Sequence, residues 1–239
     1  MLLLALDTCD LKGGVALLHD DVLLATAIHD ADEDYSIWLL PAVDRVLQSA
    51  RCTMSEVDAF GVASGPGSFT GVRIGLTTVK AWCEVYGKPV AAVSRLHAIA
   101  WKGSAGRKCV AAFANARRGQ VFGAVYRHGD AGLERVGEEM VIAPGEFVRT
   151  ALEQSRGERI SWATPDIDGL LDTPEWHERQ RLGDEPEIVP AFLADTIARL
   201  AEGELAAGRA IRVLELDANY VRRTDAERSE EHTSELQSP

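Results

Sequence analysis

The sequence predicts an α/β protein made of two consecutive halves that share one architecture, each with the element order βββαβα. Three observations favour this fold class. Short apolar runs that suit strands alternate with longer segments of helical periodicity. A small polar segment, GSAGR at residues 103–107, interrupts the chain near its middle. Beyond it, residues 109–130 repeat the pattern of residues 2–20: a strand, a polar turn with glycine, a second strand and a turn with aspartate.

The first half begins with three apolar runs separated by short polar turns, at residues 2–6, 15–18 and 22–28. Runs this short and this closely joined predict an antiparallel meander. The next segment places apolar residues at helical spacing and predicts an amphipathic helix that presents them on one face. These residues are Ile37, Leu39, Leu40, Val43, Val46 and Leu47.

A predicted strand at residues 59–63 comes next. It is followed by the sequence SGPGSFTGVRIGL at residues 64–76 and by a helix that extends to about Tyr86. Residues 90–93 predict another strand. Ser94 is a suitable N-cap for a short helix after it, because its hydroxyl oxygen can accept from the first backbone N–H groups of a helix.

The second half repeats the order of elements. It has predicted strands at 109–113, 121–126 and 159–163, a polar turn at 115–119, and helices near 145–154 and 191–207. Residues 172–186 are polar and predict a loop. Two halves of this kind favour the duplicated ribonuclease-H-like fold of the actin, sugar-kinase and Hsp70 ATPases (the ASKHA fold), in which a nucleotide lies in the cleft between the halves.

We therefore divide the chain into an N-terminal half (1–103), a C-terminal half (107–228) and a tail (229–239). The tail, SEEHTSELQSP, has one leucine and no periodicity, which predicts disorder. It also resembles translated adapter sequence, and we interpret it as non-native.

The composition limits the function classes. There are 25 basic and 37 acidic side chains, for a net charge of -12. Because nucleic-acid binding depends on an excess of basic side chains, the chain is not expected to bind nucleic acid by itself. Four scattered cysteines fit a reducing compartment. The apolar run after Met1 is too short for a signal peptide, and no run approaches the roughly 20 residues of a membrane span. We expect a cytoplasmic protein that meets no membrane.

The turn of each half carries candidate nucleotide- or anion-contacting residues. Asp7 and Thr8 close the first strand, where they either approach phosphate or satisfy amides of the turn. Asn115 takes the corresponding position in the second half, and an amide is a poorer ligand for a hard cation than a carboxylate. Ser68 and Arg73, at the start of a helix whose N–H groups can face an anion, complete the set. No GxxxxGK[ST] sequence occurs there, so the machinery for ATP hydrolysis is incomplete.

Metal chemistry has no support in the sequence. None of the six histidines forms an HxxxH or HExxH pair, so no helix presents two imidazoles on one face. We predict no metal site and no catalytic residue.

Two glycines of the central motif allow two interpretations. Gly71 and Gly75 lie one turn apart on the predicted helix, and each glycine costs about 1 kcal/mol relative to alanine in a helix interior. Such a stripe indicates that another backbone comes close. The neighbour is either the protein's own sheet or a helix of a second subunit, and the sequence leaves both open.

Four motifs together resemble the TsaB (YeaZ) family: LLALDT at the N-terminus, GVASGPGSFTGVRIGL, ANARRGQVFGAVY and YVRR at 220–223. Their order and spacing cover residues 1–228. The resemblance implies an ASKHA-type fold and a non-catalytic subunit in the synthesis of threonylcarbamoyladenosine in tRNA. Family members commonly have aspartate where this chain has Asn115, which weakens any expectation of nucleotide hydrolysis.

The resemblance also implies partners. TsaB-like proteins pair with TsaD, the catalytic paralogue, and act with TsaE, so tRNA is met only through the complex. Self-association through the same face is expected when TsaD is absent. The implied pairing surface maps onto two helices of the first half, through Leu39, Val43, Gly71, Val72, Gly75, Thr78, Val79 and Trp82. No intrinsic cofactor is implied, and ATP or ADP at a shared interface stays open. The alternatives are a stand-alone ASKHA ATPase or kinase that uses Asp7, and a metal-dependent glycoprotease-like enzyme.

Overall fold

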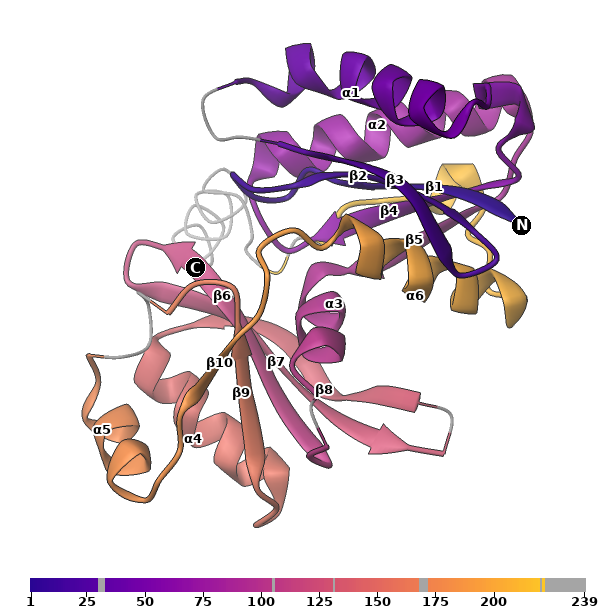
Figure 1. Ribbon diagram of the computed structural model, residues 1–239. Helices are drawn as coiled ribbons and strands as arrows, with labels where there is room; N and C mark the ends of the chain where they lie inside the picture. Colours follow the sequence, from indigo (N-terminus) through magenta and orange to yellow (C-terminus); the bar gives the residue numbers. More distant parts are fainter. Residues whose placement is uncertain (30–32, 105, 131, 168–171, 220, 222–239) are drawn as a thin grey trace, which may run out of the picture.

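The computed structural model describes residues 1–29, 33–104, 106–130, 132–167, 172–219 and 221. Its first sheet has the strand order β3-β2-β1-β4-β5 (Figure 1). The strands are β1 (Leu2–Asp7), β2 (Gly14–His19), β3 (Val22–Ile28), β4 (Ala59–Gly65) and β5 (Val90–Ser94). The predicted antiparallel meander β1-β2-β3 is confirmed, and β4 and β5 add to it in parallel with β1.

The second sheet repeats this arrangement, with the order β10-β9-β6-β7-β8. Its strands are β6 (Cys109–Arg117), β7 (Gln120–Gly129), β8 (Gly132–Ile142), β9 (Ile160–Thr164) and β10 (Pro186–Ile188). In both sheets the first strand lies between the second and the fourth, and the hairpins are antiparallel. The duplicated α/β fold of the prediction is confirmed, with one more strand and helix in each half than βββαβα.

Helices cover both faces of the first sheet (Figure 1). On one face lie α1 (Tyr35–Ala50) and α2 (Phe69–Tyr86), and on the other lies α6 (Ala194–Ala206). Central strands covered on both sides need apolar residues at every position, and Leu3, Leu4, Ala5 and Leu6 of β1 are all fully buried. The continuous apolar run at the N-terminus is therefore a buried strand.

Each half contributes a helix that packs against the sheet of the other half. The short helix α3 (Arg95–Lys102) lies between the sheets and contacts β6, β7 and β9 as well as β4 and β5. The helix α6 comes late in the sequence but packs on the first sheet, where Asp195 forms a 3.0 Å ion pair with Lys102 of α3. The residues around 103–107 link the two sheets, whereas the chain after β10 returns to the first half.

The second sheet is covered on its outer side by α4 (Pro144–Ser155), which contacts α5 (Pro174–Arg181). The loop predicted at 172–186 was wrong in part, because it contains α5 and the start of β10. Thr173 caps α5 by accepting from the N–H of Trp176, and the indole of Trp176 is fully buried. One aromatic anchor thus orders a segment whose other residues are mostly polar. Short 3-10 turns at Met54–Glu56 and Val213–Glu215 complete the described elements.

The buried face of α1 differs from the prediction. Ile37 and Leu40 are 64% and 57% exposed, whereas Trp38 and Ala42 are buried. The buried set has the regular spacing of one helix face, and its members are Trp38, Leu39, Ala42, Val43, Val46 and Leu47. Including Trp38 rotates the predicted face, which leaves Ile37 and Leu40 on the outer side. The tail 229–239, and all of the YVRR motif except Val221, lie outside the described residues.

Candidate functional site in the cleft between the halves

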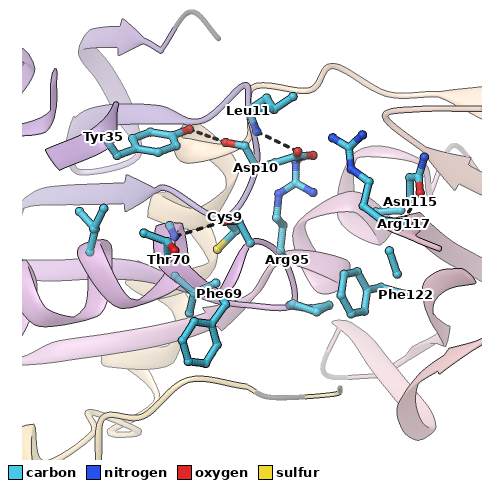
Figure 2. Close-up of a pocket in the computed structure, with 18 of the residues that line it drawn as sticks. Cys9, Asp10, Leu11, Tyr35, Phe69, Thr70, Arg95, Asn115, Arg117 and Phe122 are labelled. Carbon is cyan, nitrogen blue, oxygen red and sulfur yellow. Dashed lines mark hydrogen bonds and ion pairs between the residues drawn. The ribbon is translucent and has the colours of Figure 1, made fainter. Parts of the chain in front are cut away.

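A cavity of about 1000 Å³ lies between the two halves. Its walls come from the turn after β1 (residues 9–11), the starts of α1 and α2, and the β6–β7 hairpin (residues 114–118). Asn219 and Val221 add a wall from the C-terminal segment. Figure 2 shows Cys9 and Asp10 on one side, Asn115 and Arg117 on the other, and Arg95 between them. The turn of each half therefore faces the same cavity, as the ASKHA arrangement predicts.

The two turns are built alike. Oδ1 of Asp7 accepts from the N–H of Cys9 at 3.0 Å, and Oδ1 of Asn115 accepts from the N–H of Arg117 at 2.8 Å. Each side chain thus bridges to the backbone two residues later. Asn115 therefore makes the same local turn contact as Asp7. Only the first of the two carries a charge.

The sequence interpretation missed Arg95, the first residue of α3. Its guanidinium is 2% exposed and lies in the cavity wall. Nε is 3.4 Å from Oδ2 of Asp7, and Nη2 is 3.1 Å from Oδ2 of Asp10, an ion pair without hydrogen-bond geometry. Burial lowers the pKa of Arg95, but the carboxylates of Asp7 and Asp10 outweigh it and raise that pKa. The only signal in the sequence was a charged residue at the start of a largely apolar helix.

Other groups near the turn are held in their neutral forms. Burial, with the nearby charge of Asp7, raises the pKa of the Cys9 thiol well above its usual range. Burial also raises the pKa of Tyr35, whose hydroxyl donates to the carbonyl of Asp10 at 2.6 Å. The thiol and the phenol therefore keep their protons at neutral pH.

The five candidate nucleotide- or anion-contacting residues lie in different places. Ser68 and Asn115 line the cavity, and Ser68 caps α2 by accepting from the N–H of Gly71 at 3.3 Å. Asp7 and Thr8 are buried beneath the cavity wall. The guanidinium of Arg73 lies 3.8 Å above the ring of Phe69 and is not part of that wall.

The placement of the pairing surface needs correction. A Cβ on Gly71 would lie 2.0 Å from the carbonyl oxygen of Thr8, and one on Gly75 would lie 2.5 Å from Oγ1 of Thr8. The glycine stripe therefore packs against the turn after β1, in the protein's own first half. Four further residues of that prediction are buried in the core, namely Leu39, Val43, Val72 and Val79. Of the eight, Thr78 and Trp82 are partly exposed.

Metal and membrane features are absent from the part of the chain that the structure describes. No group of three or more histidine, cysteine or acidic side chains there could hold a metal ion. None of its helices is both long and apolar enough to cross a bilayer.

Comparison with known proteins identifies the family to which the chain is similar. Residues 29–171 match the family described as TsaD: tRNA N6-adenosine threonylcarbamoyltransferase. The tRNA threonylcarbamoyladenosine biosynthesis protein TsaB of Bacillus subtilis is 30% identical over 85% of this chain and 96% of its own length. TsaB of Escherichia coli is 27% identical over 93% and 95%.

Solved structures agree with the sequence relatives. The structure titled YeaZ from Pseudomonas aeruginosa superposes with a TM-score of 0.71 at 28% identity, covering 92% of this chain and 99% of that one. The chain therefore belongs to the family described as TsaD and, within it, to TsaB (YeaZ).

Proposed function

We propose that this chain takes part in tRNA threonylcarbamoyladenosine biosynthesis as a non-catalytic subunit that pairs with a TsaD-type transferase. The observation that supports this proposal best is the pairing of the polar side chains in the two turns of the cleft. Its one buried carboxylate, Asp7, is neutralised by Arg95, and its counterpart is the amide of Asn115. Among the described residues of the wall, the acidic side chains that do not pair with Arg95 are Glu33 and Asp34, and both are exposed. The buried part of the cleft therefore offers no unpaired carboxylate and no activated nucleophile.

The outer side of the α1–α2 layer supports a pairing role. Ile37 and Leu40 expose more than half of their side chains on α1. On α2, Thr78 and Trp82 are only partly exposed, and Trp82 packs against the buried ring of Phe60. The two helices are adjacent and cover the same face of the first sheet (Figure 1). We define this surface as the α1–α2 face and propose it as the contact with TsaD. It also serves for self-association when TsaD is absent. In this proposal TsaE acts with the complex, and the chain contacts tRNA only through the complex.

Co-purification with the TsaD of the same organism tests this placement. Replacing Ile37 and Leu40 by aspartate removes two apolar contacts and adds two charges at the proposed interface. Burial of each side chain contributes about 1–2 kcal/mol, so the double variant should bind at least about tenfold more weakly. Leu182 is 66% exposed in the second half and provides a matched control as Leu182→Asp. Equal binding by both variants would place the interface elsewhere.

An ATPase assay tests the non-catalytic role separately. We expect no turnover above background by the isolated chain. A robust rate that Asp7→Ala abolishes would refute the non-catalytic proposal and favour an ASKHA ATPase or kinase.

A further inference from the structure

A cleft of this kind could hold a magnesium–nucleotide complex only if its two turns supplied oxygen ligands for the metal. Mg²⁺ demands near-octahedral oxygen coordination and depends on negatively charged ligands in such sites. Three side chains of the two turns could supply such oxygen ligands, namely Asp7, Asp10 and Asn115.

The carboxylate oxygens of the first turn are already engaged. Oδ1 of Asp7 accepts from the N–H of Cys9, and Oδ2 faces Nε of Arg95 at 3.4 Å. For Asp10, Oδ1 accepts from the N–H of Leu11 at 2.8 Å, and Oδ2 pairs with Nη2 of Arg95 at 3.1 Å. A metal ion here would compete with the guanidinium for Oδ2 of both carboxylates.

The second turn does not compensate. Asn115 supplies a neutral carbonyl oxygen, which is already used by the N–H of Arg117. The hairpin also brings Arg117 and Arg118 into the cavity wall, which adds positive charge to this side. Around the two turns a divalent cation is therefore opposed from both halves, and the other acidic residues of the wall, Glu33 and Asp34, are exposed.

Arg95 is fixed in this position. It is the first residue of α3, directly after Ser94, whose hydroxyl accepts from the N–H groups of Leu96 and His97 and so caps the helix. The side chain is 2% exposed and Asp7 is fully buried, so the pair is not a surface ion pair that water can replace. Figure 2 shows the guanidinium directed at the turn that carries Asp10.

We propose that Arg95 is a built-in counter-ion, whose guanidinium occupies the cation position of the cleft and keeps the cavity from taking up a divalent metal ion. The inference rests on the proposed non-catalytic role and names the residue that enforces it in this chain. The residues present do not fit a metal–nucleotide complex, and Arg95 is the main reason.

Manganese binding to the purified full chain, followed by electron paramagnetic resonance, tests this assignment. We expect no saturable binding by the wild type or by Arg95→Lys, which keeps the charge. Arg95→Ser should gain one equivalent of Mn²⁺ with at least tenfold higher affinity, and adding Asp7→Asn should abolish the gain. Arg117→Ser removes a different cavity arginine and should gain nothing. Saturable binding by the wild type that depends on Asp7 would overturn the proposal, as would a folded Arg95→Ser variant without any gain.

A stability cycle covers the case in which Arg95→Ser does not fold. Removing the guanidinium leaves a buried unpaired charge on Asp7, so Arg95→Ser/Asp7→Asn should recover a cooperative thermal transition that Arg95→Ser alone lacks or shows at a lower temperature. A double variant no more stable than the single one would contradict the counter-ion role. Co-purification of the folded double variant with TsaD keeps the two proposals distinguishable, because pairing through the α1–α2 face does not depend on Arg95.

Discussion

Replacing Gly71 by alanine should destabilise the isolated chain, although alanine is the better helix former. Gly71 lies in the first turn of α2, beside the turn that follows β1. A Cβ there would be 2.0 Å from the carbonyl oxygen of Thr8, and real Cβ contacts are essentially never shorter than 3.0 Å. Either α2 or the buried turn must therefore move by about 1 Å or more.

The magnitude follows from three contributions. Alanine gains about 1 kcal/mol of helix propensity over glycine. Overpacking a buried site costs about 1–3 kcal/mol, and the displacement also disturbs the 2.7 Å hydrogen bond from Oγ1 of Thr8 to the carbonyl of Gly71, worth about 1 kcal/mol. We expect the free energy of unfolding to fall by about 2 kcal/mol, measured by urea denaturation with circular dichroism.

The chain contains a matched control. Gly203 lies in α6 with no atom within 4 Å of an added Cβ, so Gly203→Ala should raise the free energy of unfolding by about 1 kcal/mol. If Gly71→Ala were as stable as Gly203→Ala, the glycine stripe would not be packed against the first turn. The interpretation that it faces a second subunit would then regain support. For the same reason a bulky residue at Gly75 is a poor probe of the interface, because it would damage the fold first.

Three further predictions concern single side chains outside the cleft. Glu139 of β8 accepts from Ser94, Tyr126 and Asn219, so Glu139→Ala should lower the free energy of unfolding by about 3 kcal/mol, at about 1 kcal/mol per lost hydrogen bond. The neighbouring Glu138→Ala (90% exposed) should have no effect, and equal losses for the two would argue against this network. Burial lowers the pKa of His97 below 6.5; the unfolded chain then binds the extra proton, so stability should fall as the pH drops below about 6.5. Thermal melts at pH 8 and 5.5 should show a smaller loss for His97→Gln, and an unchanged loss would remove His97 as the cause. Cys52 is the one cysteine that is not buried, so brief alkylation at pH 8 followed by mass spectrometry should find it modified before the other three, unless the turn around Cys9 opens readily.

Much of the fold could be predicted because local patterns in this chain agree with the final packing. Strands buried on both faces leave uninterrupted apolar runs, and β1 and β4 were found in this way. Helix ends were visible where a capping residue stands, as at Ser94 before α3. The helix α5 was missed because its stability depends on one buried tryptophan at 176 rather than on a periodic face.

The site was harder to predict because its decisive contacts join distant parts of the chain. Arg95 and Asp7 are 88 positions apart, and no local pattern relates them. The glycine stripe did indicate a close backbone, as predicted, but its partner is the turn at Thr8, 63 positions from Gly71. A sequence pattern reports that a neighbour is close, whereas only the fold reports which neighbour it is.

The contacts of the SGPGSFTGVRIGL motif link the proposed partner-binding surface to the Asp7–Arg95 pair beside the cleft. Small residues on the inner side of α2 let the helix approach Thr8 closely, and the N–H of Ser68 donates to the carbonyl of Cys9 at 2.7 Å. These contacts hold the first turn in the position where Arg95 neutralises its carboxylates. They also fix α2 beside α1, with the outer side chains of both helices left for a partner. The inner side of the motif thus serves the fold, and we place its functional role on the opposite side, where TsaD is proposed to bind.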